Sequence, residues 1–447
     1  MNFRPQAFRS DGDCELTNGH TVTVKQPVTF LRKDQPTTTV RPNSLAFHVL
    51  AKPSGAICNL DCTYCFFLDK ADLYPDSVFR MDLPVLEAYL TQLFEVTAGD
   101  EITISWQGGE PTLLGKAWFE RAVELANSLK PPRVRLLHTM QTNATLIDDD
   151  WAQLLAKHQF LVGVSIDGPP ALHDAFRVDK KGGATSDRVL RGLKALQRRG
   201  VEVNALVTVN SANMDHGLEV YRYLRDELQL RYFQFIPIVE HADGVISAES
   251  VTPQGWGSFL TTVFDEWFRH DVGEVYVSMI DAALAPLVGA PAGMCIFAET
   301  CGDAIALEHN GDVYSCDHFV DPDHLLGNVL SNHLGDLVTS AAQRGFGRAK
   351  KSTLPSQCTT CPVLSQCRGE CPKNRLFPSE TGDGAINYLC AGYLEYFTHA
   401  NPVLTLMARQ LLAGGYADEV PDLVFSAPAD QPCPCGSGQA RGVCHLR

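Results

Sequence analysis

The chain has 447 residues, 45% of them hydrophobic and 20% charged, which is long enough for two or three domains around a large core. Its formal net charge of −15 weighs against nonspecific binding to nucleic acid or to a membrane, because both favour a basic face. No apolar run reaches the length of a membrane helix, and the first residues lack the apolar region of a signal peptide, so we expect a cytoplasmic protein.

The fifteen cysteines are the most informative part of the composition. In a cytoplasmic chain they indicate metal ligands rather than disulfides. Three lie at residues 58–65, eight lie between Cys295 and Cys390, and three lie close to the C-terminus. Cys14 is left over and is expected to be a plain thiol. It belongs to a polar extension, residues 1–44, for which the sequence indicates no role.

Residues 45–240 alternate short apolar strands with helical stretches, and this pattern predicts a parallel sheet. The expected strands are 45–51, 101–106, 134–140, 161–166, 203–209 and 232–238. The expected helices are 84–97, 116–129, 148–158, 186–199 and 218–228. Six such units fit an α/β fold, a partial (βα)6 barrel, whose ligands bind at the C-terminal ends of the strands.

The first cysteine block follows the first expected strand and reads Cys58-x3-Cys62-x2-Cys65. Three cysteines can ligate three irons of a four-iron cluster and leave the fourth iron without a protein ligand. An open metal position is what catalysis requires. Taken alone, the same spacing also fits a zinc knuckle or reduced structural thiols.

Polar motifs follow the next strands at the edge where ligands are expected. The stretch 107–111, Gln-Gly-Gly-Glu-Pro, follows the second strand, and its paired glycines let a backbone approach a ligand closely. Gln-Thr-Asn follows the third strand at 141–143. Ser-Ile-Asp-Gly follows the fourth at 165–168, and Arg177 comes shortly after. Each motif alone could be a turn or a solvated charge, but their order at successive strand ends indicates a single site.

Residues 241–290 form a connector with helical and strand character and no obvious chemistry, and the pattern changes at Cys295. Alternation around Asn310 and Gly311 predicts a β-hairpin, after which Asp317 directly follows a cysteine. The cysteines of this region are Cys295, Cys301, Cys316, Cys358, Cys361, Cys367, Cys371 and Cys390. They suffice for two fully ligated iron–sulfur clusters or for one or two structural zinc sites. Their spacing does not decide how they pair.

The chain ends with a helix expected at 393–412, a linker rich in Pro and Ala to about residue 431, and a final cluster of metal-ligand residues. That cluster is Cys433, Cys435, Cys444 and His445. Three thiolates and an imidazole make a tetrahedral zinc set. The alternative is an unliganded, disordered tail.

Together these motifs resemble the radical S-adenosylmethionine (radical SAM) superfamily with a SPASM domain and, within it, the anaerobic sulfatase-maturating enzymes. The resemblance covers residues 45–400 and rests on the first cysteine block, the stretches 107–113, 141–143, 173–178 and 233–238, and the eight later cysteines with Asp317. It implies a radical SAM core at 45–240, a connector at 241–290, a SPASM domain at 291–400, and a helix and linker at 401–431. Residues 432–447 look like the SEC-C zinc motif.

The resemblance also implies individual roles. The cluster that cleaves SAM would be held by Cys58, Cys62 and Cys65. One auxiliary [4Fe-4S] cluster would be held by Cys295, Cys301, Cys316 and Cys371, and a second by Cys358, Cys361, Cys367 and Cys390. SAM contacts would come from Tyr64, Gln107, Gly108, Gly109, Glu110, Ser165, Arg177 and Ile238. Ile238 is as readily a buried strand residue. Asp317 would be the catalytic base, with a solvated turn carboxylate as the alternative.

These roles imply oxidation of a cysteine or serine in an unfolded sulfatase polypeptide to Cα-formylglycine. The cofactors would be three [4Fe-4S] clusters, SAM and a zinc ion at the C-terminus. The expected partners are the sulfatase, an electron donor such as flavodoxin or ferredoxin, and translocation or ribosome-associated factors that the tail would recruit. Two departures from the family are Phe67, where tyrosine is common, and Ala144, where glycine is common.

Two alternatives to this function stay open at the level of sequence. One is a SPASM peptide maturase that forms thioether or carbon–carbon crosslinks. The other is a non-catalytic electron carrier or zinc-binding adaptor.

Overall fold

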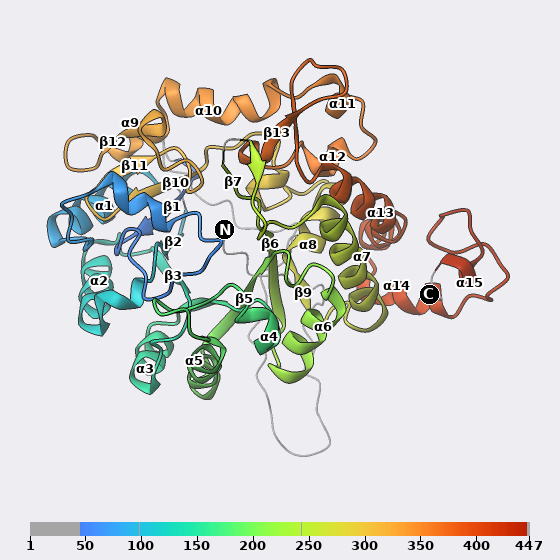
Figure 1. The fold of residues 1–447 in the computed structure, drawn as a ribbon, viewed down its shortest axis with the longest axis horizontal. Helices are drawn as coiled ribbons and strands as arrows, with labels where there is room; N and C mark the ends of the chain where they lie inside the picture. Colours follow the sequence, from blue (N-terminus) through green and yellow to red (C-terminus); the bar gives the residue numbers. More distant parts are fainter. Residues whose placement is uncertain (1–44, 98, 243, 445–447) are drawn as a thin grey trace.

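A ten-stranded sheet forms the centre of the computed structural model, which describes residues 45–97, 99–242 and 244–444 (Figure 1). The strand order is β12-β11-β10-β1-β2-β3-β4-β5-β6-β9. Its parallel core consists of β1 (His48–Lys52), β2 (Glu101–Trp106), β3 (Arg135–Thr142), β4 (Leu161–Ser165), β5 (Glu202–Val209) and β6 (Tyr232–Pro237). The predicted α/β partial barrel of six units is therefore confirmed. The extension at 1–44, with Cys14, and His445 lie outside the described residues.

Helices between the strands cover the outer face of the sheet (Figure 1). They are α1 (Leu83–Val96), α2 (Lys116–Leu129), α3 (Asp149–Lys157), α4 (Pro170–His173), α5 (Ser186–Arg198) and α6 (Gly217–Arg222), which continues as a π-helical turn, Tyr223–Glu227. Side-chain hydrogen bonds to the backbone fix the residues at which α1 and α3 begin. The carboxylates of Asp82 and Asp148 accept hydrogen bonds from the backbone N–H of Val85 and Trp151, at 3.0 and 2.8 Å, and so cap α1 and α3.

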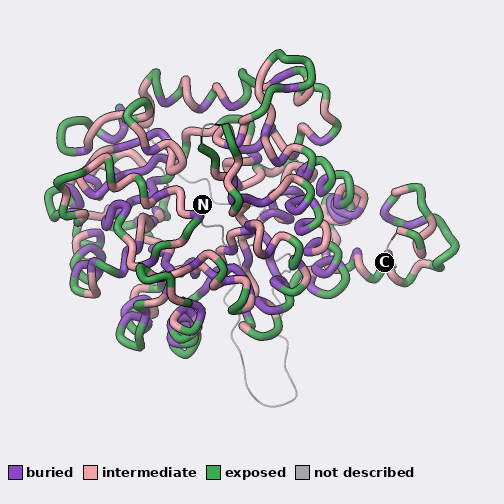
Figure 2. The backbone as a smooth tube through the Cα atoms, in the orientation of Figure 1, coloured by how far each residue is buried: buried purple, intermediate pink, exposed green. Residues whose placement is uncertain are grey.

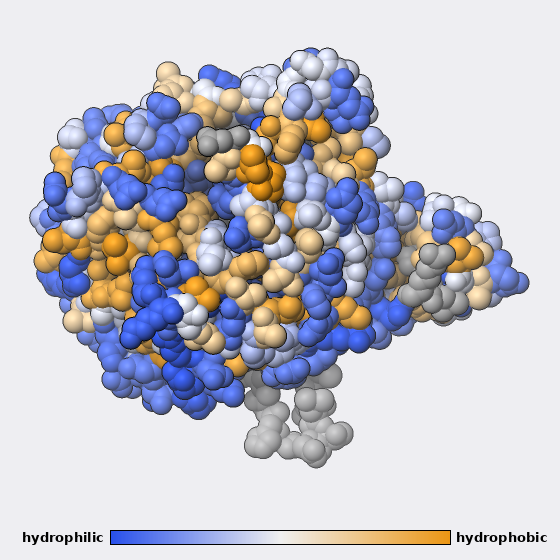
Figure 3. Space-filling view, in the orientation of Figure 1, coloured by the Kyte–Doolittle hydropathy of each residue, from blue (hydrophilic) through white to orange (hydrophobic). Residues whose placement is uncertain are grey.

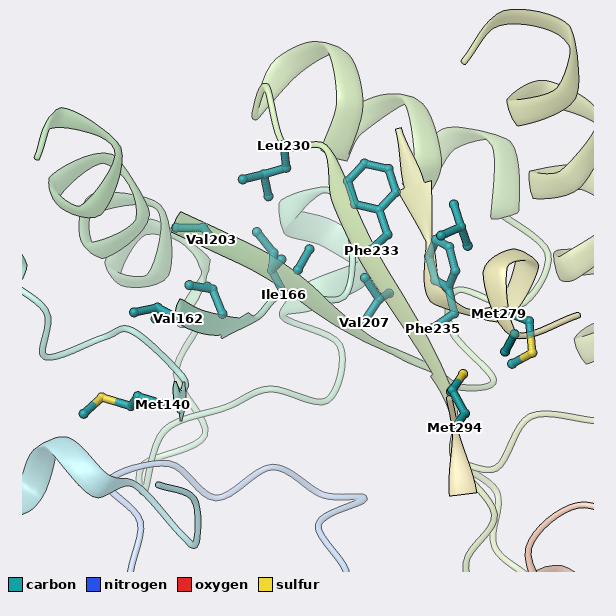
Figure 4. Close-up of a cluster of buried hydrophobic side chains, with 14 of the residues drawn as sticks. Met140, Val162, Ile166, Val203, Val207, Leu230, Phe233, Phe235, Met279 and Met294 are labelled. Atoms are coloured by element: carbon teal, nitrogen blue, oxygen red, sulfur yellow. The ribbon is translucent and has the colours of Figure 1, made fainter. Parts of the chain in front are cut away.

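The barrel core lies between the sheet and these helices. Val162, Val203 and Val207 come from neighbouring strands and point into one apolar cluster with Phe233 and Phe235 (Figure 4). Buried segments follow the strands and the inward helix faces, whereas exposed segments lie on the outer turns (Figure 2). Continuous apolar runs are typical of parallel strands that are covered on both faces.

The region after the barrel is organised by two long helices, α7 (Pro253–His270) and α13 (Cys390–Leu412). They pack through aromatic pairs such as Trp256 with Tyr393, whose ring centroids are 5.9 Å apart. In the second part of the connector at 241–290, β9 (Tyr276–Val277) is short and α8 (Ser278–Leu284) follows directly. Helical hydrogen bonds take over where β9 ends.

The hairpin expected around Asn310 and Gly311 is present as β10 (Ala304–Glu308) and β11 (Asp312–Tyr314), with β12 (Leu325–Asn328) beside it. The place of this hairpin in the sheet could not be predicted from the local sequence pattern. The strand β10 pairs in parallel with β1, in register from His48 opposite Ala304 to Lys52 opposite Glu308. The cysteine-rich half of the chain therefore continues the same sheet.

The remaining elements of that half are short. They are α9 (Leu334–Val338), α10 (Ala341–Ser352), α11 (Ser356–Thr359), α12 (Leu364–Cys367), and two hairpins, β7 (His241–Ala242) with β8 (Val245–Ile246) and β13 (Arg375–Pro378) with β14 (Ala385–Asn387). Part of the expected linker is ordered as α14 (Val420–Phe425), whose Phe425 ring lies 5.4 Å from that of Phe268. The chain then reaches α15 (Arg441–Cys444), in a lobe that projects from the body (Figures 1 and 3). Among the described helices, none is long and apolar enough to span a bilayer.

Candidate functional site

The first cysteine block lies in the loop after β1, and its three thiols are close enough to influence one another electrically. Burial, followed by Glu110 and the neighbouring Cys62 and Cys65, raises the pKa of the Cys58 thiol to about 12. The fourteen described cysteines are all free thiols. Three soft sulfur donors on one loop fit an iron–sulfur cluster that keeps one iron open.

The eight later cysteines separate into two groups in space. Burial is the main reason that the pKa of Cys316 rises to about 12, and nearby Cys295 and Cys301 contribute to that rise. Burial raises the pKa of Cys371 well above its ordinary value, and Cys316 and Cys295 lie close enough to raise it as well. These four thiols form the first group.

The second group is built in the same way. Burial raises the pKa of Cys367 to about 12, with Cys390 and Cys358 among the groups that raise it. The pKa of Cys390 is raised by burial and then by Cys358 and Cys361. These neighbours are the ones that the crossed grouping implied by the resemblance requires, and the grouping itself stays a prediction. Each group offers four thiols, a set that fits a fully ligated cluster.

The glycine pair after β2 is clamped against the loop that carries Cys58. The backbone N–H of Gly109 donates to the carbonyl of Gly55 at 2.7 Å, and that of Glu110 donates to the carbonyl of Ile57 at 2.9 Å. A Cβ atom at Gly109 would lie 2.1 Å from the carbonyl oxygen of Ile57, and one at Gly108 would lie 2.8 Å from that of Gly55. Only glycine allows this close backbone contact.

The side chain of Glu110 joins the ends of β2 and β3 beneath that loop. It is fully buried and accepts four hydrogen bonds, from Thr112 N and Oγ1, Thr142 Oγ1 and Asn143 N, at 3.0, 2.6, 2.7 and 2.8 Å. Burial raises the pKa of this carboxyl, and the four donors oppose that rise. The amide of Asn143 reaches the Cys58 sulfur at 3.6 Å. Glu110 is therefore committed to protein donors, which leaves the turn's backbone as the part that could meet a ligand.

Tyr64 and Arg177 meet at Asp167, to which the sequence analysis had assigned no role. Asp167 is fully buried, accepts a hydrogen bond from the Tyr64 hydroxyl at 2.5 Å and lies 3.0 Å from Arg177 Nε. The contact between Arg177 and Asp167 is an ion pair between two buried side chains. Burial, together with Asp167, raises the pKa of Tyr64 well above its ordinary value. The signal in the sequence was the Asp-Gly pair after the fourth strand, but a carboxylate there reads equally well as a turn residue.

The remaining expected SAM contacts lie at the ends of their strands. Ser165 ends β4, and its hydroxyl accepts a hydrogen bond from Gln141 Nε2 at 2.8 Å. Gln107 follows β2, with its N–H donating to Ala51 at 2.8 Å. Ile238 is buried just after β6, where its N–H donates to Val209 at 2.8 Å. Its strand contacts are those of an ordinary core residue, so the two interpretations of Ile238 both remain.

Asp317 lies against the barrel rather than in a solvated turn. Its carboxylate is in ion-pair contact with Lys52, the last residue of β1, and its side chain is 21% exposed. Burial is the largest single influence on the pKa of Asp317 and raises it, but Lys52 and His318 both act in the opposite direction, and the net pKa is below its ordinary value.

Contacts that Phe67 makes with Lys52 and Phe66 makes with His318 place Asp317 between two sets of cysteines. One set is the block of Cys58, Cys62 and Cys65, and the other is the group that contains Cys316 and Cys371. The Lys52 ammonium lies 3.5 Å from the ring centroid of Phe67, two residues after Cys65. Beside Asp317, the His318 ring lies 5.3 Å from that of Phe66, and its Nδ1 is 3.6 Å from the Cys371 sulfur. The sequence analysis missed Lys52 and His318. The only signal in the sequence for either residue was a lysine, Lys52, at the end of an apolar strand.

Comparisons with known proteins agree with this arrangement. The radical SAM superfamily model matches residues 53–224, and the SPASM model, an iron-sulfur cluster-binding domain, matches residues 295–362. A "Serine-type anaerobic sulfatase-maturating enzyme" of Bacteroides thetaiotaomicron is 38% identical over 392 residues, which cover 84% of this chain and 94% of that protein.

A "Cysteine-type anaerobic sulfatase-maturating enzyme" of Clostridium perfringens (strain 13 / Type A) is 30% identical over 81% of this chain and 98% of its own length. Among solved structures, "Native anSMEcpe with bound AdoMet and Cp18Cys peptide" superposes with a TM-score of 0.74 at 30% identity. It covers 81% of this chain and 99% of that chain.

The close packing of Gly109 against the backbone of Ile57 can be tested by adding a methyl group there. Gly109→Ala should lower SAM-dependent formation of 5′-deoxyadenosine by about 100-fold, because its methyl group must push the Cys58 loop away, and displacements near 1 Å can cost that much. The measurement is deoxyadenosine by liquid chromatography after anaerobic reduction with SAM.

The matched control is Gly345→Ala in α10, where a Cβ meets nothing within 4 Å. Its deoxyadenosine yield should equal that of the wild type. A wild-type rate for Gly109→Ala would show that the clamp is not needed.

Proposed function

The chain belongs to the anaerobic sulfatase-maturating enzymes, and we propose that the residues placed above carry out this family's reaction, the radical SAM oxidation of a sulfatase serine or cysteine to formylglycine. The observation that carries the residue assignment is the position of Asp317. A partly exposed carboxylate lies between the loop of Cys58, Cys62 and Cys65 and the first later cysteine group. A substrate that reached Asp317 would be next to both.

The proposed cofactor ligands are the three cysteine sets. Cys58, Cys62 and Cys65 would hold the cluster that binds SAM, and the two later groups would each hold an auxiliary [4Fe-4S] cluster. When bound, these groups supply a deoxyadenosyl radical that takes a hydrogen atom from the substrate Cβ and an acceptor for the electron then released. The Gly108–Gly109 turn, Ser165, Arg177, Tyr64 and Ile238 would surround SAM.

Asp317 would accept the proton of the substrate hydroxyl or thiol. A carboxylate of ordinary pKa near 4 is a weak base for such a proton, but the adjacent carbon radical makes the proton more acidic. Loss of a hydrogen atom, a proton and an electron together leaves a carbon–oxygen or carbon–sulfur double bond. A thioaldehyde from cysteine then hydrolyses to the same aldehyde.

We also propose a preference for serine over cysteine. Its support is the higher identity to the serine-type protein, 38%, than to the cysteine-type protein, 30%. Both substrates lead to formylglycine, so the preference concerns relative rates. The proposed reaction takes place in the cytoplasm on an unfolded sulfatase segment, with flavodoxin or ferredoxin as the electron donor.

The reaction is tested directly with peptides. Anaerobic incubation with SAM, a reductant and a short sulfatase-motif peptide should give formylglycine by mass spectrometry, faster for serine than for cysteine. The triple variant Cys58→Ala, Cys62→Ala, Cys65→Ala should form no deoxyadenosine while it still binds iron at the eight later cysteines. SAM cleavage by this variant would contradict the assignment of the first block.

The role of Asp317 has its own test. Asp317→Asn keeps the shape of the side chain but removes its charge, so SAM binding should survive. Formylglycine formation should fall about 10²–10⁴-fold, the usual loss when one general base is removed. The two quantities are followed by equilibrium binding of SAM and by peptide mass spectrometry. A near-normal yield would return Asp317 to the role of a turn residue.

The C-terminal thiols are proposed as a separate zinc site. The sulfur atoms of Cys433, Cys435 and Cys444 all lie within 4.8 Å of one another, which is compact enough for one metal ion. His445, the proposed fourth ligand, is outside the described residues. By its likeness to the SEC-C motif, this lobe would dock translocation or ribosome-associated factors and raise the local concentration of substrate.

Removal of residues 427–447 should therefore leave peptide oxidation unchanged and lower the zinc content by one ion per chain, measured by elemental analysis. The cut spares α14, which packs on the body through Phe425. Maturation of a full-length sulfatase in cells should fall. Loss of peptide oxidation in the truncated protein would show that the lobe belongs to the catalytic fold.

A further inference from the structure

We propose that Lys52 is a positioning residue that fixes the carboxylate of Asp317 for the reaction. This inference rests on the role proposed above for Asp317. Lys52 ends β1, its ammonium is in ion-pair contact with Asp317, and the same nitrogen lies 3.5 Å from the ring centroid of Phe67. The start of the barrel, residues 52 and 67, and the distant residue 317 therefore meet at this one nitrogen.

The two partners differ in exposure, and this difference separates their roles. The Lys52 side chain is 3% exposed, whereas the Asp317 side chain is 21% exposed. The Asp317 oxygen that faces Lys52 is buried, so a substrate would meet the other part of the Asp317 side chain and not the ammonium behind it. Lys52 therefore acts through Asp317 and is not a catalytic residue itself.

Lys52 is held more firmly than Asp317. It pairs in register with Glu308 of β10, and its neighbour Ala51 pairs with Trp106 of β2. A Cβ built on Gly108 would lie 3.3 Å from the Lys52 Cβ, so the SAM-facing turn packs on the same strand end. Asp317 lies outside the named strands, in a turn closed by a single bridge from Cys316 to Phe319. A rigid strand end thus anchors a less regular segment.

The positive charge of Lys52 is balanced by the Asp317 carboxylate. A buried ammonium needs a partner, and Asp317 together with the Phe67 face provides one. The second lysine of this region, Lys373, directs its ammonium to Glu240 at 2.6 Å and lies 4.9 Å from the ring centroid of Phe66. Among the described residues, Lys52 is the lysine in ion-pair contact with Asp317.

The test separates hydrogen abstraction from product formation. A peptide deuterated at the target Cβ reports abstraction as deuterium in deoxyadenosine, and mass spectrometry reports formylglycine. Lys52→Met keeps the chain length and the packing on Phe67 but removes the charge. Deuterium transfer should persist, while formylglycine per deoxyadenosine falls about 10-fold or more, with an unchanged peptide KM.

Lys52→Arg, which restores a cation, should recover part of that yield. Lys116→Met is the matched control, because Lys116 forms an ion pair with Asp150 on the surface. It should behave as the wild type.

A double-mutant cycle with Asp317→Asn completes the design. The double variant should yield no less formylglycine than Asp317→Asn alone, since Lys52 has nothing left to position. A normal yield for Lys52→Met would overturn the proposal, as would parallel losses of deuterium transfer and product, which indicate damage to the fold. A normal yield for Asp317→Asn would instead overturn the base assignment and this inference with it.

Discussion

The contact between the glycine turn after β2 and the cysteine loop after β1 is the constraint on which the site depends. Two backbone hydrogen bonds, from Gly109 and Glu110, tie the turn to residues 55–57, immediately before Cys58. The buried Glu110 carboxylate extends this tie to Thr142 and Asn143 at the end of β3. A carboxylate that accepts four protein hydrogen bonds is costly to move, because each freed donor would be left buried and unpaired. The loop of Cys58, Cys62 and Cys65 is therefore fixed by the barrel.

A second junction brings the cysteine-rich half of the chain to the same place. Because β10 pairs in parallel with β1, the two halves share one sheet. Lys52 at the end of β1 then contacts Asp317, and Phe66 contacts His318. The site is assembled at this seam, so both halves are needed for it.

The two departures from the family acquire physical meaning in this setting. Phe67 is buried, and its ring face receives the Lys52 ammonium, a role that needs an aromatic ring and no phenol. Ala144 adopts φ +57°, in the left-handed region that favours glycine, which costs about 1–2 kcal/mol for an L-residue. Its N–H donates to Thr142 Oγ1 at 3.0 Å, so the network around Glu110 holds it there.

The sequence by itself determined the elements and the chemistry. Apolar runs defined β2 and α2 to the residue, and the cysteine spacings indicated iron–sulfur ligands, because both depend on neighbours along the chain. Only the tertiary structure decided that β10 extends the sheet beside β1 and that Asp167 and Asp317 face Arg177 and Lys52. These contacts join residues more than a hundred positions apart, or, for Asp167 and Arg177, the two ends of a turn. Local pattern does not encode them, since they depend on the pairing of strands and on which side chains the closed barrel buries together.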